Sequence, residues 1–364
     1  MKKIVSVKGV FIFIVSGTLI LLMLAACGDN IPYDYNNSSS IINDVAQPDT
    51  DIDIAIPTPE HVPQTPENSH TSLTVEAAAY LFGRLQDMWD ADGGEMWGVP
   101  LHVPVIFVCG DTHIAMANRP DSQGEFIRQY ADDIAVYIGT RRPIEYFIYL
   151  TWDGQRGVMW SWDFMHDIDP GLKSIVHTGF HTLQRSLFGF YGATGFGSGA
   201  AESWASILLE LNALVYALNN TGDIRLEAVE HALSIRYSRR QNFRDYAHLE
   251  NEIQLSEGTA HYTEMHIVFS RYEIDELIQY WPGMFMEIDS GSDVAIFFGY
   301  YSGTLYGTLL DDFGVSWRPY IDRHTDLGLI LADALGITTF MPLYEIDLEK
   351  YGYNEITKRV HPHD

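Results

Sequence analysis

Two histidines four residues apart are the first residues in this sequence whose spacing predicts chemistry. They are His177 and His181, in the segment SIVHTGFHTLQ. On a helix, residues i and i+4 lie one above the other on the same face, so two imidazoles can bind one metal ion. Gln184, seven residues after His177, continues the same stripe. The alternative is a pair of partly buried structural histidines, because 14 histidines in 364 residues give about half such a pair by chance.

A second polar stripe lies in the segment LENEIQLSEGTAHYTE. Its polar side chains recur at intervals of three or four residues, which is the spacing of one helix face; they are Glu250, Gln254, Glu257, His261 and Glu264. One interpretation is an acidic face exposed to solvent, and the other is a set of carboxylates that face the histidine pair. The small residues Gly258 and Ala260 favour the second interpretation, because they allow another helix to pack closely.

Together, HTGFHTLQ and EGTAHYTE resemble the zincin-type metallopeptidases of the gluzincin class. In that class, an H-E-x-x-H helix supplies two zinc ligands and a general base, and a following helix with an E-G-x-A-x-Y-like signature supplies the third ligand. The resemblance extends to a group of exported bacterial proteins with that fold. The matching blocks are TRRPIEYFIYLTWDG, ESWASILLELNALVYAL, HALSIRYSRR and SGTLYGTLLDDFGVSW, and they extend over most of residues 100–340.

The resemblance implies a zinc site made of three residues. His177 and His181 match the two histidine ligands, and Glu257 matches the third. The separation between His181 and Glu257 is long for this class, so Glu210 in LLELNAL is kept as the alternative third ligand.

One residue departs from the family pattern. Thr178 occupies the position of the general base in H-E-x-x-H, and its hydroxyl is not a base near neutral pH. Loss of a general base lowers the rate by about 10²–10⁴-fold. Glu250 and Glu264 are the candidates for a relocated base. Under the resemblance, Tyr262 and Tyr306 are candidates for hydrogen-bond donors to a developing oxyanion, and the alternative is that both are core residues.

The N-terminus predicts export and lipid anchoring. Residues 1–26 combine a basic start with an apolar run that is short for a spanning helix, and LAAC at their end resembles a bacterial lipobox. Cys27 is expected to be lipidated and to hold the protein on the outer face of a membrane. Cys109 is the only other cysteine, so no disulfide is expected within the chain, and its apolar surroundings predict a buried side chain.

Composition divides the rest of the chain into a tether and a globular part. Residues 27–70 are acidic, rich in proline and serine and free of Lys and Arg, which predicts a disordered tether. Residues 71–364 are expected to form one domain of the α+β class. A small mixed or antiparallel sheet, with a hairpin at WDGQRG, is expected in about 71–170, and a helical zincin-like part in about 171–364. The net charge of −27 argues against nucleic acid as a partner.

The sequence leaves three functions open. The first is an extracytoplasmic lipoprotein of metallopeptidase-like fold that can bind zinc and whose peptidase activity is weak or lost, a pseudoenzyme. The second is an active cell-surface zinc metallopeptidase that acts on a peptide or protein with a relocated base. The third is a non-catalytic binding or envelope-structural lipoprotein. We take the first as the working hypothesis, because Thr178 lies inside an otherwise matched motif.

Overall fold

The structure of the chain is a computed structural model. It describes residues 72–144, 147–165, 168–189, 203–288 and 291–360. Residues Ser72–Asp364 form one compact unit. Cys27 and the predicted signal peptide and tether lie outside the described residues. Within the described ranges, no helix is both long enough and apolar enough to span a membrane.

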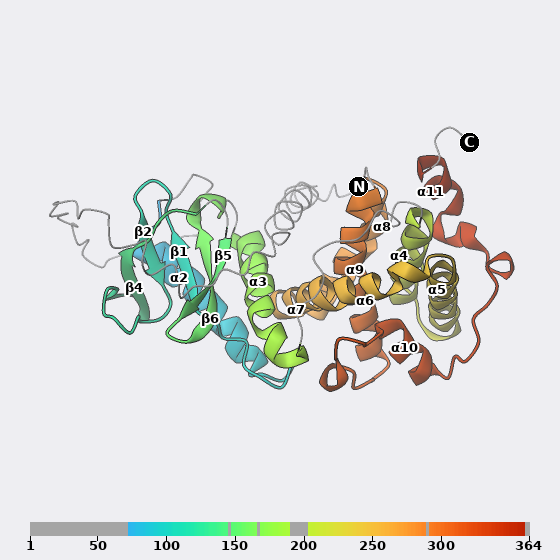
Figure 1. Cartoon of the computed structure of the whole chain (residues 1–364), viewed down its shortest axis with the longest axis horizontal. Helices are drawn as coiled ribbons and strands as arrows, with labels where there is room; N and C mark the ends of the chain where they lie inside the picture. Colours follow the sequence, from blue (N-terminus) through green and yellow to red (C-terminus); the bar gives the residue numbers. More distant parts are fainter. Residues whose placement is uncertain (1–71, 145–146, 166–167, 190–202, 289–290, 361–364) are drawn as a thin grey trace, which may run out of the picture. The chain divides into compact units, whose positions relative to one another are not determined.

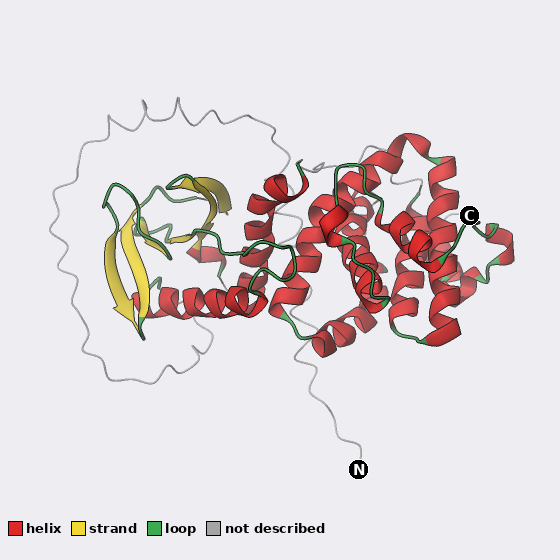
Figure 2. Cartoon of the chain, turned by 90° about the horizontal axis from the view of Figure 1, so that it is seen from below, coloured by secondary structure: helices red, strands yellow, loops and turns green. Residues whose placement is uncertain are grey.

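A mixed sheet makes up the first part of the described chain (Figure 1; yellow in Figure 2). Its strands are β1 (Val105–Val108), β2 (Ile114–Ala117), β3 (Ile127–Ala131), β4 (Ile134–Thr140), β5 (Phe147–Trp152) and β6 (Gln155–Ser161). The order across the sheet is β3-β4-β2-β1-β6-β5, and the pair β1–β6 is parallel whereas the other neighbours are antiparallel.

A tight turn sets the register of the hairpin formed by β5 and β6. Asp153 and Gly154 have φ angles of 50° and 79°, and they join β5 to β6 so that Trp152 pairs with Gln155. Such left-handed turn residues match the twist of the flanking strands. This is the hairpin that the sequence predicts at WDGQRG. Strands β2 and β3 are not predicted from the sequence, because β2 has only four residues and β3 is largely exposed.

Cys109 differs from its prediction. Strand β1 ends at Val108, and the free thiol of Cys109 follows in the turn, where it is only partly buried. The apolar run continues one residue further than the strand, so hydrophobicity alone overestimates the burial of this cysteine.

Helices follow the sheet, and nine of them lie in the described part of the chain. They are α3 (Ile168–Phe188), α4 (Trp204–Leu218), α5 (Gly222–Asn242), α6 (Ala247–Ile253), α7 (Thr259–Val268), α8 (Arg271–Phe285), α9 (Gly291–Asp312), α10 (Leu327–Leu335) and α11 (Tyr353–Val360). The preceding helix, α2 (Val75–Asp92), packs on the sheet, and its Phe82 stacks on Phe107 of β1 with ring centroids 5.2 Å apart. The architecture is α+β, as the sequence predicts.

A π-helical segment, Gln254–Gly258, joins α6 and α7 end to end (Figure 1). The sequence predicts a single helix here, and the π turn within it is not predicted. Gly258 lets the backbone of α9 approach closely, because a Cβ atom on Gly258 would lie 2.5 Å from the Gly299 oxygen and 2.7 Å from Cα of Gly303. The close helix packing that Gly258 predicts is therefore confirmed, and it occurs beside Glu257.

Candidate metal centre

Helix α3 brings the two histidines of the H-x-x-x-H pair together. Their rings meet edge to face, with centroids 4.7 Å apart and planes at 78°. The Nε2 atoms of His177 and His181 are 3.0 Å apart. The side chains are 3% and 12% exposed, so both nitrogens lie inside the protein. The convergence expected from helical spacing is present.

Glu257 joins this pair from the π-helical segment. Its Oε2 atom lies 3.3 Å from Nε2 of His177 and 3.4 Å from Nε2 of His181. The three residues form a buried group that can hold a metal ion. Among the described residues, it is the one group of three or more His, Cys, Asp or Glu side chains close enough to do so. Sequence spacing leaves Glu257 and Glu210 as alternatives, and the fold brings Glu257 to the histidines.

The triangle of ligand atoms has the size that a zinc ion requires. Zinc bonds to imidazole nitrogen and carboxylate oxygen are about 2.0–2.1 Å long, so tetrahedral geometry places two ligand atoms about 3.3–3.4 Å apart. The three sides measured here are 3.0, 3.3 and 3.4 Å. Shifts of a few tenths of an ångström would seat an ion, so the residues present fit zinc.

Gln184 fixes the tautomer of His181. Its amide nitrogen donates to the Ser256 carbonyl oxygen at 2.6 Å and to Oγ1 of Thr259 at 3.0 Å. Its Oε1 atom therefore faces Nδ1 of His181, at 2.7 Å. We assign the proton of neutral His181 to Nδ1, because an amide oxygen can only accept. The lone pair of His181 is then on Nε2, on the side of Glu257.

Glu264 plays the same part for His177. Its Oε2 atom lies 3.1 Å from Nδ1 of His177, an ion-pair contact rather than an aligned hydrogen bond. A carboxylate only accepts, so Nδ1 carries the proton of the neutral ring and Nε2 carries its lone pair. Contacts of this kind orient metal-binding imidazoles. Tyr300 of α9 stacks on the ring of His177, with centroids 5.3 Å apart and planes at 7°.

Three hydrogen-bond acceptors therefore face one point, and their lone pairs repel unless a cation lies between them. In the metal-free protein a proton fills this role. Burial alone would lower the pKa of His177, but the carboxylates of Glu257 and Glu264 raise it to about 9. Burial would likewise raise the pKa of Glu257, but the nearby His181 and His177 hold it well below its ordinary value.

Both candidates for a relocated base are paired with cations. Burial would raise the pKa of Glu264, but Lys173 and His177 lower it to about 2. Burial acts the same way on Glu250, whose pKa is lowered to about 2 by Arg239, which donates to its two oxygens at 2.9 and 3.1 Å. Carboxylates with pKa values this low are weak bases near neutral pH.

Glu210 lies in a second buried group, which we call the arginine cluster. Its members are Glu210, Arg236, Arg239, Arg240, Glu250 and Asp326. The Tyr306 hydroxyl donates to Oε1 of Glu210 at 2.8 Å, and Nη1 of Arg236 donates to the same atom at 3.2 Å. The hydroxyl of Tyr262 lies between Asp311 and Arg318. Both tyrosines expected beside an oxyanion thus have hydroxyls bound to other groups.

Thr178, at the position of the missing base, is 1% exposed. Its Oγ1 atom has no hydrogen-bond partner among the described residues. A threonine hydroxyl can donate one hydrogen bond but cannot take up a proton near neutral pH. Among the described residues, the carboxylate of Glu264 contacts His177, but it is paired with Lys173 and does not replace the missing base.

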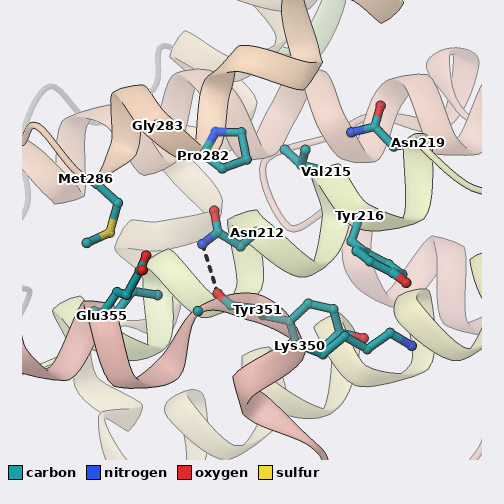
Figure 3. A pocket seen from close by; sticks show the side chains of 12 residues that line it. Asn212, Val215, Tyr216, Asn219, Pro282, Gly283, Met286, Lys350, Tyr351 and Glu355 are labelled. Carbon is teal, nitrogen blue, oxygen red and sulfur yellow. Dashed lines mark hydrogen bonds between the residues drawn. The ribbon is translucent and has the colours of Figure 1, made fainter.

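A separate pocket of about 340 Å³ lies between α4, α8 and the C-terminal segment (Figure 3). Val215, Pro282 and Met286 form apolar parts of its wall. Asn212 is one of its lining residues and donates to the Tyr351 carbonyl oxygen at 3.0 Å. The three candidate metal ligands are not among its lining residues, so this pocket is distinct from the metal centre.

Comparisons with known proteins found no family model, no curated protein and no solved structure that matches this chain. Of the features that the metallopeptidase resemblance implies, the structure shows one, the buried group of His177, His181 and Glu257, which can hold a metal ion.

Two residues of the site have roles that sequence reasoning missed. Gln184 shares the stripe of the histidines, and its place one turn after His181 is the signal for its contact with that ring. Tyr300 stacks on His177 from a helix distant in sequence, and no local pattern indicates this contact.

Proposed function

We propose that this protein is a membrane-anchored, extracytoplasmic lipoprotein with a metallopeptidase-like fold that binds zinc and whose peptidase activity is weak or lost. The observation that carries the proposal is the convergence of two imidazole lone pairs and one carboxylate on a single point. Two histidines and one glutamate are a donor set that zinc uses when one coordination position stays open. Zinc bound there would supply a Lewis acid.

The residues around the ligands hold them in place. Gln184 and Glu264 keep the protons of the two imidazoles on Nδ1, so that Nε2 of each ring is available for binding. Thr178 supplies no base, and the paired state of Glu250 and Glu264 speaks against the alternative of an active peptidase with a relocated base. A peptide or protein is the ligand class that such a fold would retain.

The zinc content of the purified full-length chain tests the proposal. We expect about one equivalent of zinc in the wild type, and less than a tenth of that in His181→Ala. His248→Ala is the matched control, because His248 is an exposed histidine on α6 and contacts none of the three ligands. A wild type that takes up no zinc from micromolar zinc solutions would refute the proposal.

The membrane anchor has its own test. We expect the full-length protein to partition with the membrane fraction, and Cys27→Ser to be recovered as unprocessed or soluble protein, because two acyl chains provide stable anchoring. Equal partitioning of the two proteins, with no lipid on Cys27 by mass spectrometry, would refute the anchor and leave the zinc site unaffected.

A further inference from the structure

The polar stripe on the helix formed by α6, the π-helical segment and α7 divides into two halves with different partners. Glu250 and Gln254 face the arginine cluster. Glu257 and Glu264 face His177. The stripe is neither a solvent-exposed acidic face nor a uniform set of ligands. It connects two buried polar groups through a few residues of one helix.

The arginine cluster is electrically balanced and buried. Three arginines meet three carboxylates, and the side chains of Arg236 and Arg239 are 4% and 0% exposed. Arg236 donates to Glu210 at 3.2 Å and to Asp326 at 3.0 Å, and it thereby links α5 to α4 and to the N-cap residue of α10. Every charge of the cluster has an opposite charge beside it, although Nε of Arg236 and Oε2 of Glu210 make no hydrogen bond among the described residues. Such a network resists displacement, because a shift leaves a buried charge unpaired.

Gln254 joins this network to the π-helical segment. Nη2 of Arg236 donates to Oε1 of Gln254 at 3.0 Å. The amide nitrogen of Gln254 donates to Oγ of Ser302 on α9, at 2.9 Å. Gln254 is 1% exposed and is the first residue of the π-helical segment, three residues before Glu257. One end of the segment is therefore held by side chains from α5 and α9.

The π turn gives this anchoring a consequence for Glu257. A π turn contains one residue more than an α turn, and each residue of an α-helix rotates the chain by about 100°. If the π turn relaxed to α-helix, α7 would rotate by about 100° relative to α6. Glu257 and Glu264 would then leave His177.

We propose that Gln254 is a positioning residue for the metal centre. It transmits the rigidity of the arginine cluster to the π-helical segment and thereby keeps Glu257 within reach of His177 and His181 before an ion arrives. The inference rests on the proposed zinc site. It adds that the affinity of this site depends on contacts made by a residue that is not itself a ligand.

The test compares zinc affinities of variants of the full-length chain, measured by competition with a chromogenic chelator. Gln254→Met removes both side-chain hydrogen bonds at nearly constant volume, and we expect zinc to bind about 10–100-fold more weakly. Gln254→Glu keeps an acceptor for Arg236 and for the Ser302 hydroxyl, and we expect an affinity within about threefold of the wild type. Thr308→Val is the control, because Thr308 is a buried residue of α9 whose hydroxyl contacts His266 instead.

Cobalt spectra and apo stability separate positioning from a general loss of structure. The visible absorption of bound Co²⁺ reports coordination geometry, and we expect it to change in Gln254→Met and to stay unchanged in Thr308→Val. In the presence of a chelator, the midpoint temperature of thermal unfolding should be lowered similarly in Gln254→Met and in Thr308→Val. If Gln254→Met does not fold, Ser302→Ala removes one of the two contacts and should weaken zinc binding about threefold to tenfold.

Each outcome assigns the failure to one claim. Equal zinc affinities of the wild type and Gln254→Met, or of the wild type and Ser302→Ala, would overturn the positioning role and leave the zinc site standing. An equal loss of affinity in Thr308→Val would also overturn it. A wild type that binds no zinc would instead overturn the proposed function itself.

Discussion

Nδ1 of His181 lies 2.7 Å from Oε1 of Gln184, one turn further along the same helix. The amide nitrogen of that glutamine reaches the Ser256 carbonyl in the π-helical segment, at 2.6 Å. One side chain therefore sets the proton position of a candidate ligand and also ties α3 to the segment that carries Glu257. Both effects favour the arrangement in which His177, His181 and Glu257 converge.

Replacing Gln184 should weaken zinc binding without removing a ligand. In Gln184→Met, we expect the zinc dissociation constant to rise about 10–100-fold, because His181 loses its acceptor and α3 loses its bond to Ser256. Ser186→Ala is the control on the same helix, since Ser186 is exposed and donates to the Leu183 carbonyl. Isothermal titration with zinc measures both. Unchanged affinity in Gln184→Met would contradict the role assigned to this contact.

Introducing a glutamate at position 178 should create the missing general base. We expect Thr178→Glu to hydrolyse a fluorescent casein substrate up to about 10²–10⁴-fold faster than the wild type, and to lose this activity with a chelator. Thr178→Gln is the control of matched size without a base. Zinc content shows whether each variant keeps its site. Equal hydrolysis by both zinc-loaded variants would mean that the base is not what the site lacks.

A methyl group added at the contact between Gly258 and Gly303 should destabilise the fold. A Cβ atom on Gly303 would lie 2.4 Å from Cα of Gly258, so Gly303→Ala must push α9 away from the π-helical segment. We expect it to lower the free energy of unfolding by about 1–3 kcal/mol, as overpacking does, and to weaken zinc binding. Gly283→Ala on α8 is the control, because its Cβ meets no atom within 4 Å; it should stabilise by up to about 1 kcal/mol. Urea unfolding measures both.

The arginine cluster should make stability depend on acid pH. The pKa of Glu250 falls from 4.5 to about 2 on folding, despite burial that would raise it, because Arg239 and Arg240 stabilise its charge. A lowered carboxyl pKa contributes stability above pH 4.5 that is lost as the pH falls toward 2. We expect the free energy of unfolding of the wild type to fall steeply in this window and that of Glu250→Gln to fall less.

The contribution of Glu250 to the pH dependence of stability can be separated from that of a buried histidine by its pH range. The pKa of His266 is lowered to about 4 by its burial. A lowered histidine pKa destabilises the fold as the pH drops from 6.5 to 4, and this contribution is shared by the wild type and Glu250→Gln. The two curves should therefore run parallel above pH 4.5 and differ below it. Parallel curves throughout would show that Glu250 does not titrate as assigned.

The elements that depend on local pattern could be predicted from the sequence. Helical spacing places His177 and His181 on one face, and the Asp153-Gly154 turn joins two strands, whatever the rest of the chain does. The α+β class follows from the order of such elements. The resemblance to metallopeptidases selected Glu257, and the fold brings it to the histidines.

The elements that depend on distant contacts could not be predicted. The π turn exists where Gly258 meets Gly303 and Gln254 meets Arg236. Gly258 indicates close packing, but the sequence names neither its partner on α9 nor the contact between Gln254 and Arg236. Glu210 lies in an apolar run and remained an alternative ligand, because the sequence does not indicate that arginines of α5 surround it. Glu250 and Glu264 share one stripe, and only tertiary packing assigns them to different groups.

The burial of His177 and Glu257, each with a side chain 3% exposed, has a kinetic consequence. Access to one side of the ion, past the 12% exposed His181, does not free the ion, because it leaves only when α3 and the π-helical segment separate locally. The rate of metal loss should then become independent of chelator concentration once the chelator is in excess. Metal exchange would measure how often the interior of this protein opens.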